Sequence, residues 1–223
     1  MTVTFIAHSA FLVEWDKFYT LFDYTYEPDY TGALPELSGD KPLLVFSSHS
    51  HEDHFDAKVF TLLEKYPGAR FFVSRDTRLT ERKRQWLNIS DEAFARTTVL
   101  RPDSILLTDV AGEDLSIRAI KSTDIGNAYL LRCEGKMVYH GGDLNWWDWK
   151  SEGEAYCNNM AAHYRAAIEK LAAAVENEAT DNAIAPEITA AMAPLDPRLG
   201  EGSEGLGIEE LMRQIKVQHV FPM

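Results

Sequence analysis

The chain has little cysteine and no long apolar segment, and both absences narrow the class of protein. Only Cys133 and Cys157 occur among 223 residues, so we expect neither a disulfide framework nor a thiolate metal site. No stretch approaches the ~20 apolar residues of a membrane helix, and the N-terminus lacks the basic and apolar regions of a signal peptide. We therefore expect a cytoplasmic protein that makes no membrane contact.

Basic residues are few relative to acidic ones. The chain carries 22 Lys and Arg against 35 Asp and Glu, which gives a formal net charge of −13. A field of this sign repels nucleic acid and anionic lipid, so a small molecule is the expected partner. A small anionic substrate stays compatible with it, because bound metal ions would reverse the sign locally. The composition does not indicate an oligomeric state.

The order of the expected elements indicates a single α/β domain over residues 1–223. Strands fall into two groups with helices between and after them, which favours two sheets packed face to face with helices outside, an αββα sandwich. The expected strands are 4–6, 10–15, 18–22, 43–48, 69–73, 105–107, 115–120, 128–133, 137–140, 187–192 and 217–221. The expected helices are 57–65, 75–87, 160–175 and 208–215.

Three of the seven histidines fall within one stretch of six residues, His49-Ser50-His51-Glu52-Asp53-His54. The stretch follows the apolar run 43–46, which is typical of a buried strand. Imidazole and carboxylate are ligands preferred by zinc and its first-row neighbours. An extended backbone points His49 and His51 the same way, toward one ion, and Asp53 and His54 would then turn toward a second. Helix capping or simple surface exposure of these histidines is the less favoured reading.

This H-x-H-x-D-H stretch after a buried strand resembles the signature of the metallo-β-lactamase superfamily of metallo-hydrolases. The resemblance implies the four-layer αββα sandwich of that type and two divalent ions, most suitably zinc. It also implies that Asp143, in Tyr139-His140-Gly141-Gly142-Asp143, bridges the two ions; an Asp that caps a turn is the alternative. Asp124 stands where the family carries a His. We expect Asp124 to bind metal directly or through water, and its carboxylate to make the site more tolerant of manganese or iron.

Two further histidines need an assignment. The His8-Ser9 pair resembles a turn of the family, and for His8 we favour a structural hydrogen-bonding role over a ligand role. The family's last ligand is a His after the final strand, whereas this sequence ends at Met223. We therefore expect His219 to lie within the strand, and either the sequence stops short of that last ligand or the second metal position lacks it. The alternative is that His219 itself is that ligand.

Three residues are expected to line a substrate pocket. Trp146 and Trp147 closely follow the predicted bridging Asp143, although a core-filling role is equally compatible with their positions. Arg198 could hold an anionic group of the substrate, but a structural salt bridge is the favoured role for it. Residues 24–40 are rich in Tyr, Pro and Gly, and we expect a loop that overhangs the site.

The resemblance implies a metal-dependent hydrolase that directs a metal-bound hydroxide at an ester, lactone, thioester or phosphodiester of a small molecule. Asp53 would bind metal and orient that hydroxide. The His8-Ser9 pair and the missing third His look closest to the branch that contains ascorbate-6-phosphate lactonase-like proteins. Two alternatives remain: an iron redox enzyme on the same fold, and a metal-binding protein with an incomplete site and little or no catalysis.

Overall fold

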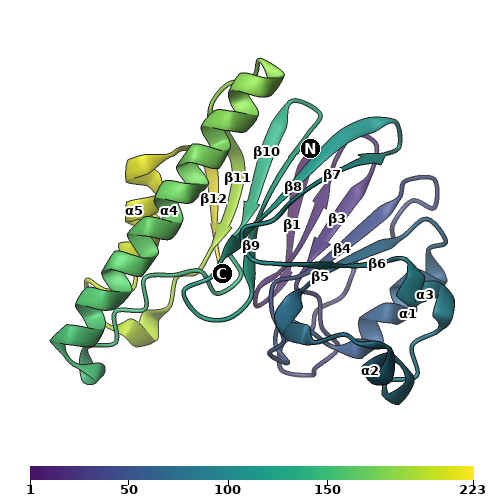
Figure 1. The fold of residues 1–223 in the computed structure, drawn as a ribbon, viewed down its shortest axis with the longest axis horizontal. Coiled ribbons are helices and arrows are strands. Elements are labelled where there is room, and N and C mark those ends of the chain that lie inside the picture. Colours follow the sequence, from purple (N-terminus) through teal and green to yellow (C-terminus); the bar gives the residue numbers. More distant parts are fainter.

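The computed structural model describes residues 1–223 and contains two six-stranded sheets that face each other, with helices outside (Figure 1). This confirms the predicted αββα sandwich. The first sheet has the order β1-β2-β3-β4-β5-β6, antiparallel from β1 to β3 and parallel from β3 to β6. Its strands are Thr2–Ala7, Ala10–Glu14, Tyr19–Phe22, Leu43–Ser47, Arg70–Ser74 and Thr97–Leu100.

The second sheet has the order β12-β11-β10-β9-β8-β7. Strands β7 to β10 pair antiparallel, and β10, β11 and β12 pair parallel. The strands β7 to β12 are Ile105–Val110, Glu113–Lys121, Asn127–Cys133, Lys136–His140, Glu187–Ala193 and Lys216–Pro222.

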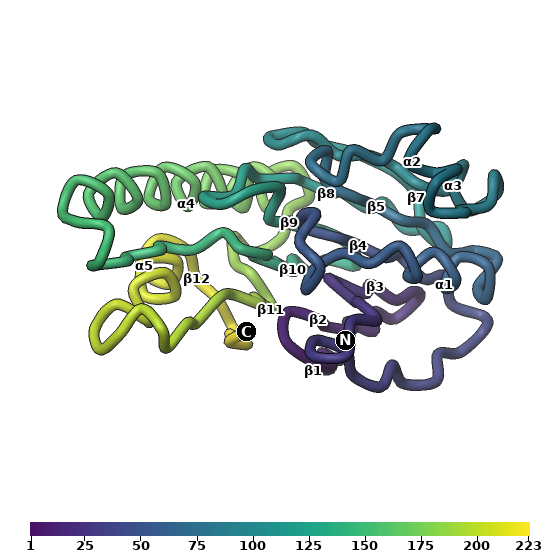
Figure 2. The backbone as a smooth tube through the Cα atoms, turned by 90° about the horizontal axis from the view of Figure 1, so that it is seen from below, coloured from purple at the N-terminus to yellow at the C-terminus, as the bar shows by residue number.

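The helices divide between the two outer faces. In Figure 2, α4 and α5 lie at one end of the molecule and α1, α2 and α3 at the other, with the strands between them. The α-helices α1 to α5 are Phe60–Lys65, Glu81–Trp86, Asp91–Ala95, Glu154–Asn182 and Leu206–Gln214. Four 3₁₀ helices, η1 to η4, are Ala57–Val59, Arg75–Thr77, Lys150–Glu152 and Pro197–Leu199.

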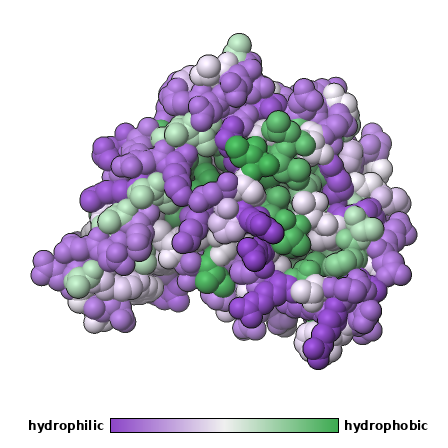
Figure 3. All heavy atoms as spheres, in the orientation of Figure 1, coloured by the Kyte–Doolittle hydropathy of each residue, from purple (hydrophilic) through white to green (hydrophobic).

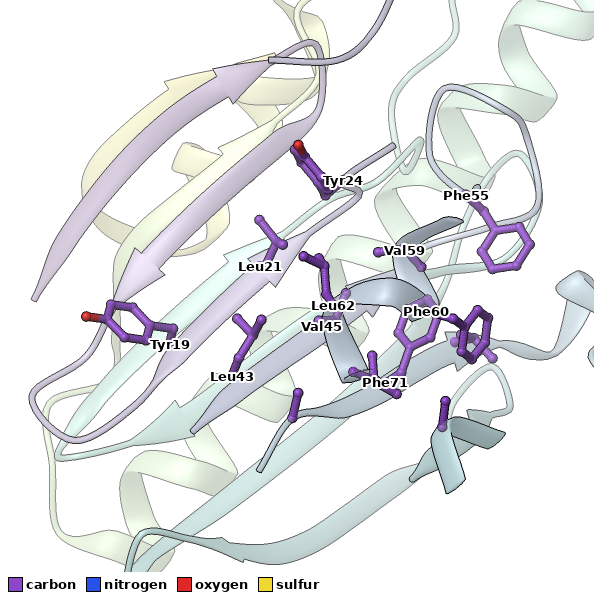
Figure 4. Packing of buried hydrophobic residues seen from close by; sticks show 14 of the residues in the cluster. Tyr19, Leu21, Tyr24, Leu43, Val45, Phe55, Val59, Phe60, Leu62 and Phe71 are labelled. Atoms are coloured by element: carbon purple, nitrogen blue, oxygen red, sulfur yellow. The ribbon is translucent and has the colours of Figure 1, made fainter. Parts of the chain in front are cut away.

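Strand β4 is an example of a central strand that is apolar on both faces. Leu43 and Val45 pack toward α1 in an outer cluster that also contains Phe60 and Phe71 (Figure 4). Leu44 and Phe46 belong instead to the cluster between the two sheets. Successive side chains of a strand point to opposite faces, so a strand covered by helices on one side and a sheet on the other must be apolar at every position.

The same alternation builds the other half of the sandwich. In β9, Tyr129 and Leu131 face the first sheet, whereas Ala128 and Leu130 face α4 and α5. The molecule therefore has three apolar layers between its four structural layers. Figure 3 shows a largely hydrophilic surface with hydrophobic atoms near the centre of the face, and Ile105 and Leu107 of edge strand β7 are exposed.

Some elements differ from the sequence expectation. Helix α3 and strand β6 were not predicted, because they are short and mostly polar or exposed; in β6 only Leu100 is buried. Helix α4 begins at Glu154 and ends at Asn182, well beyond the predicted 160–175. Its added turns are largely polar and lack the apolar periodicity on which the prediction rested. None of the helices is both long and apolar enough to cross a membrane.

Candidate metal centre

The candidate metal centre lies where loops from both sheets meet at one edge of the sandwich. Strand β4 leads into residues 49–54, β10 leads to Asp143, and the loop between β8 and β9 carries Asp124. The turn between β1 and β2 adds His8. Loops at the carboxyl ends of parallel strands share an edge, which is how residues far apart in sequence can meet here.

The first group of ligand-type side chains is His49, His51, Asp124 and Asp143, with one donor atom of each within 4.8 Å of the others. His49 Nε2 lies 3.0 Å from His51 Nδ1 and 3.5 Å from Asp143 Oδ2. The Asp124 carboxylate lies 4.0 Å from His51 Nδ1. Tetrahedral ligands about 2.1 Å from one ion lie roughly 3.4 Å apart, so the spacing fits a single zinc-sized ion.

The second group is His8, Asp53 and His54, again with donor atoms within 4.8 Å of one another. Asp53 Oδ2 lies 3.2 Å from His8 Nε2 and 3.6 Å from His54 Nε2. The predicted division of the motif, His49 and His51 on one side and Asp53 and His54 on the other, therefore matches the grouping of these side chains.

His8 is the member of the second group to which the sequence interpretation gave no ligand role. It sits in the tight turn between β1 and β2 with φ of +47°, and its ring reaches the carboxylate of Asp53. The hydrogen bond to Asp53 fits the structural role that we favoured for His8, and the same position places it among the three side chains of the second group that could hold a metal ion. The sequence signal was the His8-Ser9 turn itself, but nothing local indicated contact with residues 45 positions away.

Asp143 lies between the two groups. Its Oδ2 is 3.5 Å from His49 Nε2, and its Oδ1 is 3.4 Å from His54 Nε2. One oxygen thus faces each group, as a carboxylate that spans two ions requires. The Asp143 carbonyl also accepts a hydrogen bond of 3.0 Å from the Trp147 indole, which ties the following loop to it.

A buried carboxylate orients the second group from behind. Asp23, at the end of β3, is 1% exposed and lies 2.7 Å from His54 Nδ1. The Ser48 backbone N–H and hydroxyl both donate to Asp23 over 2.7 Å. With Nδ1–H donated to Asp23, the other nitrogen of His54 faces the second group. Such a partner fixes the ring and raises its basicity as a metal ligand.

Glycines let the loops approach the motif closely. Gly126 has φ of +74°, and a Cβ added there would lie 2.2 Å from the Ser48 carbonyl oxygen and 2.5 Å from His49 Cβ. Gly142 has φ of +49°, and its Cβ would lie 2.5 Å from Ser48 Cβ. Glycine is therefore required in both loops, and the close approach is to the chain around Ser48.

Burial and mutual charge set the protonation of the metal-free centre. Burial, together with the neighbouring charge of His54, lowers the pKa of His49 to about 3. Burial alone would lower the pKa of His54, but the charge and hydrogen bond of Asp23 outweigh it and raise that pKa to about 9. Burial also raises the pKa of Asp143, with the charges of Asp23 and Asp53 adding to the rise. At neutral pH, His54 of the metal-free centre is therefore protonated on both ring nitrogens and positively charged.

Two carboxylates stay ionised despite burial. Burial opposes ionisation of Asp23, but the charges of His140 and His54 outweigh it and lower its pKa to about 2. Burial likewise opposes ionisation of Asp53, yet its hydrogen bond from His8 and the charge of His54 hold the pKa of Asp53 well below its usual range. The centre thus offers deprotonated carboxylate oxygens beside histidine nitrogens from which a metal ion can displace any proton. These are the donors that a divalent ion needs.

A cleft of about 370 Å³ opens beside the second group. Trp147 and Arg198, two of the predicted pocket residues, line it, together with Tyr30 from the 24–40 loop. Tyr30 also packs against the His8 ring, with the ring centroids 5.0 Å apart and the planes tilted, so this loop does overhang the site. The other residues that line the cleft are His8, Ser9, Asp53, His54, Asp143, Pro194, Leu195, Asp196 and Met223.

The remaining predicted pocket residue, Trp146, does not line this cleft. It packs beside Tyr164 of α4 and under the Arg165 guanidinium, which lies 4.5 Å from the ring centroid. The two adjacent indoles therefore point to different surroundings, and only Trp147 lines the cleft. Arg198 pairs with Asp196 through Nε and Nη2, the structural salt bridge that was favoured for it, and its side chain also lines the cleft.

Three histidines lie outside both groups: His163 on α4, His219 and His140. His219 is exposed within β12, opposite Ala190 of β11, as expected for a strand residue. His140 is fully buried at the end of β10, where its Nε2 lies 2.9 Å from the Ser9 carbonyl oxygen and its ring stacks on Phe22 at 4.8 Å. Its Nδ1 accepts from the Gly142 N–H over 3.2 Å, so it supports the turn that carries Asp143.

Two facing sheets with helices outside and a histidine and aspartate centre at one edge define a fold of the metallo-β-lactamase type. The chain belongs to the family described as "Beta-lactamase superfamily domain", whose profile matches residues 2–148, well over half of the sequence. A comparison with curated proteins gives no significant match.

Solved structures share the fold at low sequence identity. Igni18, a metallo hydrolase from Ignicoccus hospitalis, has a TM-score of 0.56 and 19% identity over 99% of this chain and 81% of its own. CmlA, a diiron β-hydroxylase from Streptomyces venezuelae, has a TM-score of 0.57 and 12% identity over 99% of this chain and 44% of its own. A putative metal-dependent hydrolase from Parabacteroides distasonis has a TM-score of 0.50 and 16% identity over 97% of this chain and 91% of its own.

Proposed function

We propose that the chain is a hydrolase that holds two divalent metal ions in the two groups described above. The observation that supports this most strongly is the position of Asp143, whose two oxygens lie 3.5 Å and 3.4 Å from one imidazole nitrogen of each group. Zinc suits such mixed nitrogen and oxygen donors. Manganese and iron suit them as well, because three of the seven donor residues are carboxylates.

The chain's own groups have distinct tasks in this reaction. When bound, two divalent ions supply Lewis acidity, which lowers the pKa of water and polarises a carbonyl or phosphoryl group. Asp53 borders the cleft and stays ionised at neutral pH, so it can accept a hydrogen bond from an attacking water and orient it. Trp147 and Tyr30 give the cleft apolar walls that exclude bulk water from the bound substrate.

The substrate that we propose is an ester, lactone, thioester or phosphodiester of a small molecule. A cleft of about 370 Å³ is of a size that holds a small ligand. Lactones remain among the candidates because the His8-Ser9 pair resembles the lactonase-like branch of the superfamily. Both cysteines are free, which is compatible with a reducing cytosol as the site of action.

The proposal is tested by metal analysis of chain purified without chelator, followed by a panel of ester, lactone, thioester and phosphodiester substrates. We expect close to two divalent ions per chain and metal-dependent hydrolysis of at least one class. His51→Ala should lose much of the bound metal and the hydrolysis, whereas His219→Ala, an exposed histidine outside both groups, should keep both. Full metal content and full activity in His51→Ala would contradict the assignment.

An iron oxygenase is the second candidate. Asp124 gives the first group two carboxylates and two imidazoles, a set that suits iron, and the diiron hydroxylase CmlA shares the fold. Iron in the purified chain, together with oxygen consumption and no hydrolysis in the panel, would favour this reading over the hydrolase.

A further inference from the structure

A second hollow, of about 380 Å³, touches the metal centre at Asp124. We call it the α4 hollow, because four of its lining residues belong to that helix. Those residues have helical positions i, i+3, i+4 and i+7, so they share one face of α4. The last residue of β8 and the loop between β8 and β9 form the rest of it. The complete lining is Lys121, Ser122, Thr123, Asp124, His163, Ala166, Ala167 and Lys170.

The lining of the α4 hollow is basic in an otherwise acidic chain. Lys121, Lys170 and His163 face a single lining carboxylate, Asp124, although the chain as a whole carries a net charge of −13. Lys170 pairs with Asp103 over 2.8 Å, but both side chains are about half exposed. Exposed pairs of this kind contribute little free energy, so Lys170 can exchange Asp103 for a bound anion.

The hollow also contains a buried hydroxyl with a hydrogen to donate. Ser122 is 5% exposed, and its Oγ accepts a hydrogen bond from the Asp124 N–H over 3.1 Å. Its own O–H is not committed to another protein group, in contrast to the Thr123 hydroxyl, which donates to the Asn145 carbonyl over 2.7 Å. Two ammonium groups and a hydroxyl donor are the groups that bind an oxyanion.

We infer that the α4 hollow binds a small oxyanion, such as phosphate or carboxylate, next to the first metal group. The anion is either a free ion or a charged group of the substrate, and in the second case the inference rests on the proposed hydrolase function. Asp124 belongs to both places, since its carboxylate lies 4.0 Å from His51 Nδ1. A metal bound by Asp124 offsets the one negative charge of the lining, so metal and anion should strengthen each other's binding.

The binding test is a titration of the full chain with inorganic phosphate, with and without zinc. Binding is measured from the shifts of backbone amide NMR signals during the titration. We expect saturable shifts at residues 121–124 and on α4, with tighter binding when zinc is present. Lys121→Gln and Lys170→Gln should each weaken phosphate binding about tenfold, the usual loss for one charge-assisted hydrogen bond. Lys216→Gln is the matched control, because Lys216 also forms an exposed ion pair but lies on β12.

In Lys170→Gln, Asp103 loses its ion-pair partner, and this alone could alter phosphate binding. A second variant tests the hollow without removing that pair. Ala166→Glu places a negative charge in the lining at an exposed helical position and should abolish binding. Asn177→Glu adds the same charge to α4 eleven residues further on, about 16 Å away, and should leave binding unchanged. Equal phosphate affinity in the wild type, both lysine variants and Ala166→Glu would overturn the inference, as would shifts that occur only around the metal ligands.

The source of the anion is decided by kinetics with a neutral ester and the same ester bearing a phosphate group. If the substrate carries the anion, Lys121→Gln lowers kcat/KM for the charged ester much more than for the neutral one. If that ratio is unchanged while inorganic phosphate binding is lost, the site takes a free ion. Hydrolysis of neither ester by the wild type, with phosphate still bound, would count against the proposed function but not against the oxyanion site.

Discussion

Asp23 is the residue on which the orientation of His54 depends. Its carboxylate is buried, accepts two hydrogen bonds from Ser48, and takes the Nδ1–H of His54 over 2.7 Å. Because Ser48 immediately precedes the metal motif, one carboxylate holds both the start of the motif and its last histidine. A negative charge in such a place is retained only if the surrounding donors stabilise it, and the lowered pKa of Asp23 reflects that stabilisation.

We predict that Asp23→Asn weakens metal binding at the second group by roughly 10–100-fold, the range seen when the hydrogen-bond partner of a ligating histidine is removed. The first group should be affected less, because His51 and Asp124 make no contact with Asp23. Calorimetric zinc titration of the variant measures both affinities. Asp16→Asn, an exposed carboxylate near the opposite end of β2, is the control. Unchanged affinity at both positions would mean that Asp23 serves only folding.

At the scale of single elements, α4 is held to the second sheet by a buried charge as well as by apolar contacts. Glu178, whose side chain is 4% exposed, accepts from Ser116 Oγ over 2.6 Å and from Arg118 Nε over 2.5 Å, both on β8. It also accepts from Arg132 Nε of β9 over 3.1 Å. These contacts fix where the helix crosses the sheet, and therefore where its other face lines the α4 hollow.

Replacement of Glu178 by Ala should lower the free energy of unfolding by about 3 kcal/mol. The reason is that Arg118 and Arg132 would remain largely buried without a counter-charge. Chemical denaturation of the metal-free chain measures the change. Glu176→Ala, on the exposed side of the same helix, should shift stability by less than about 0.5 kcal/mol. A loss of similar size in both variants would point to helix propensity and away from the ion pairs.

For the whole molecule, the raised pKa of His54 links stability to pH. Its pKa rises from 6.5 to about 9 on folding, so the protonated form stabilises the folded chain. This contribution is fully present below pH 6.5 and is lost as pH rises through about 9. A metal ion that binds His54 Nε2 must displace the proton there, so metal affinity at the second group should rise over the same range.

We therefore predict opposite pH trends for the two forms of the chain. With chelator present, the thermal midpoint should fall between pH 6.5 and about 9; with saturating zinc, the stabilisation over the chelated form should grow across that range. Differential scanning calorimetry at matched ionic strength measures both trends. In Asp23→Asn the trend of the chelated chain should be reduced, because His54 loses its partner. A chelated chain whose midpoint stays level or rises would contradict the assignment of the proton to His54.

Much of this fold and part of its centre follow from local sequence. Strand β4 could be predicted because an uninterrupted apolar run of this length fits a strand covered on both faces. The close spacing of His49, His51, Asp53 and His54 could be interpreted directly, because backbone geometry alone keeps such near neighbours together. The hairpin between β9 and β10 was also predictable from Gly135, because glycine adopts the positive φ of a tight turn without steric cost. The turn itself consists of Glu134 and Gly135, one residue earlier than a turn at Gly135 and Lys136.

The rest was decided by tertiary packing. His8 reaches Asp53 only because β1 and β2 place their turn over a loop 45 residues away, and no periodicity in the sequence encodes that contact. Trp146 and Trp147 are adjacent residues of the same type, and the sequence does not distinguish them. Yet Trp147 lines the cleft and Trp146 packs on α4. Side-chain direction at an irregular segment depends on the surfaces that enclose it. The local sequence therefore determined the donor types and the strands that carry them, whereas only the folded chain, by burying both sheets against each other, decided which donors meet.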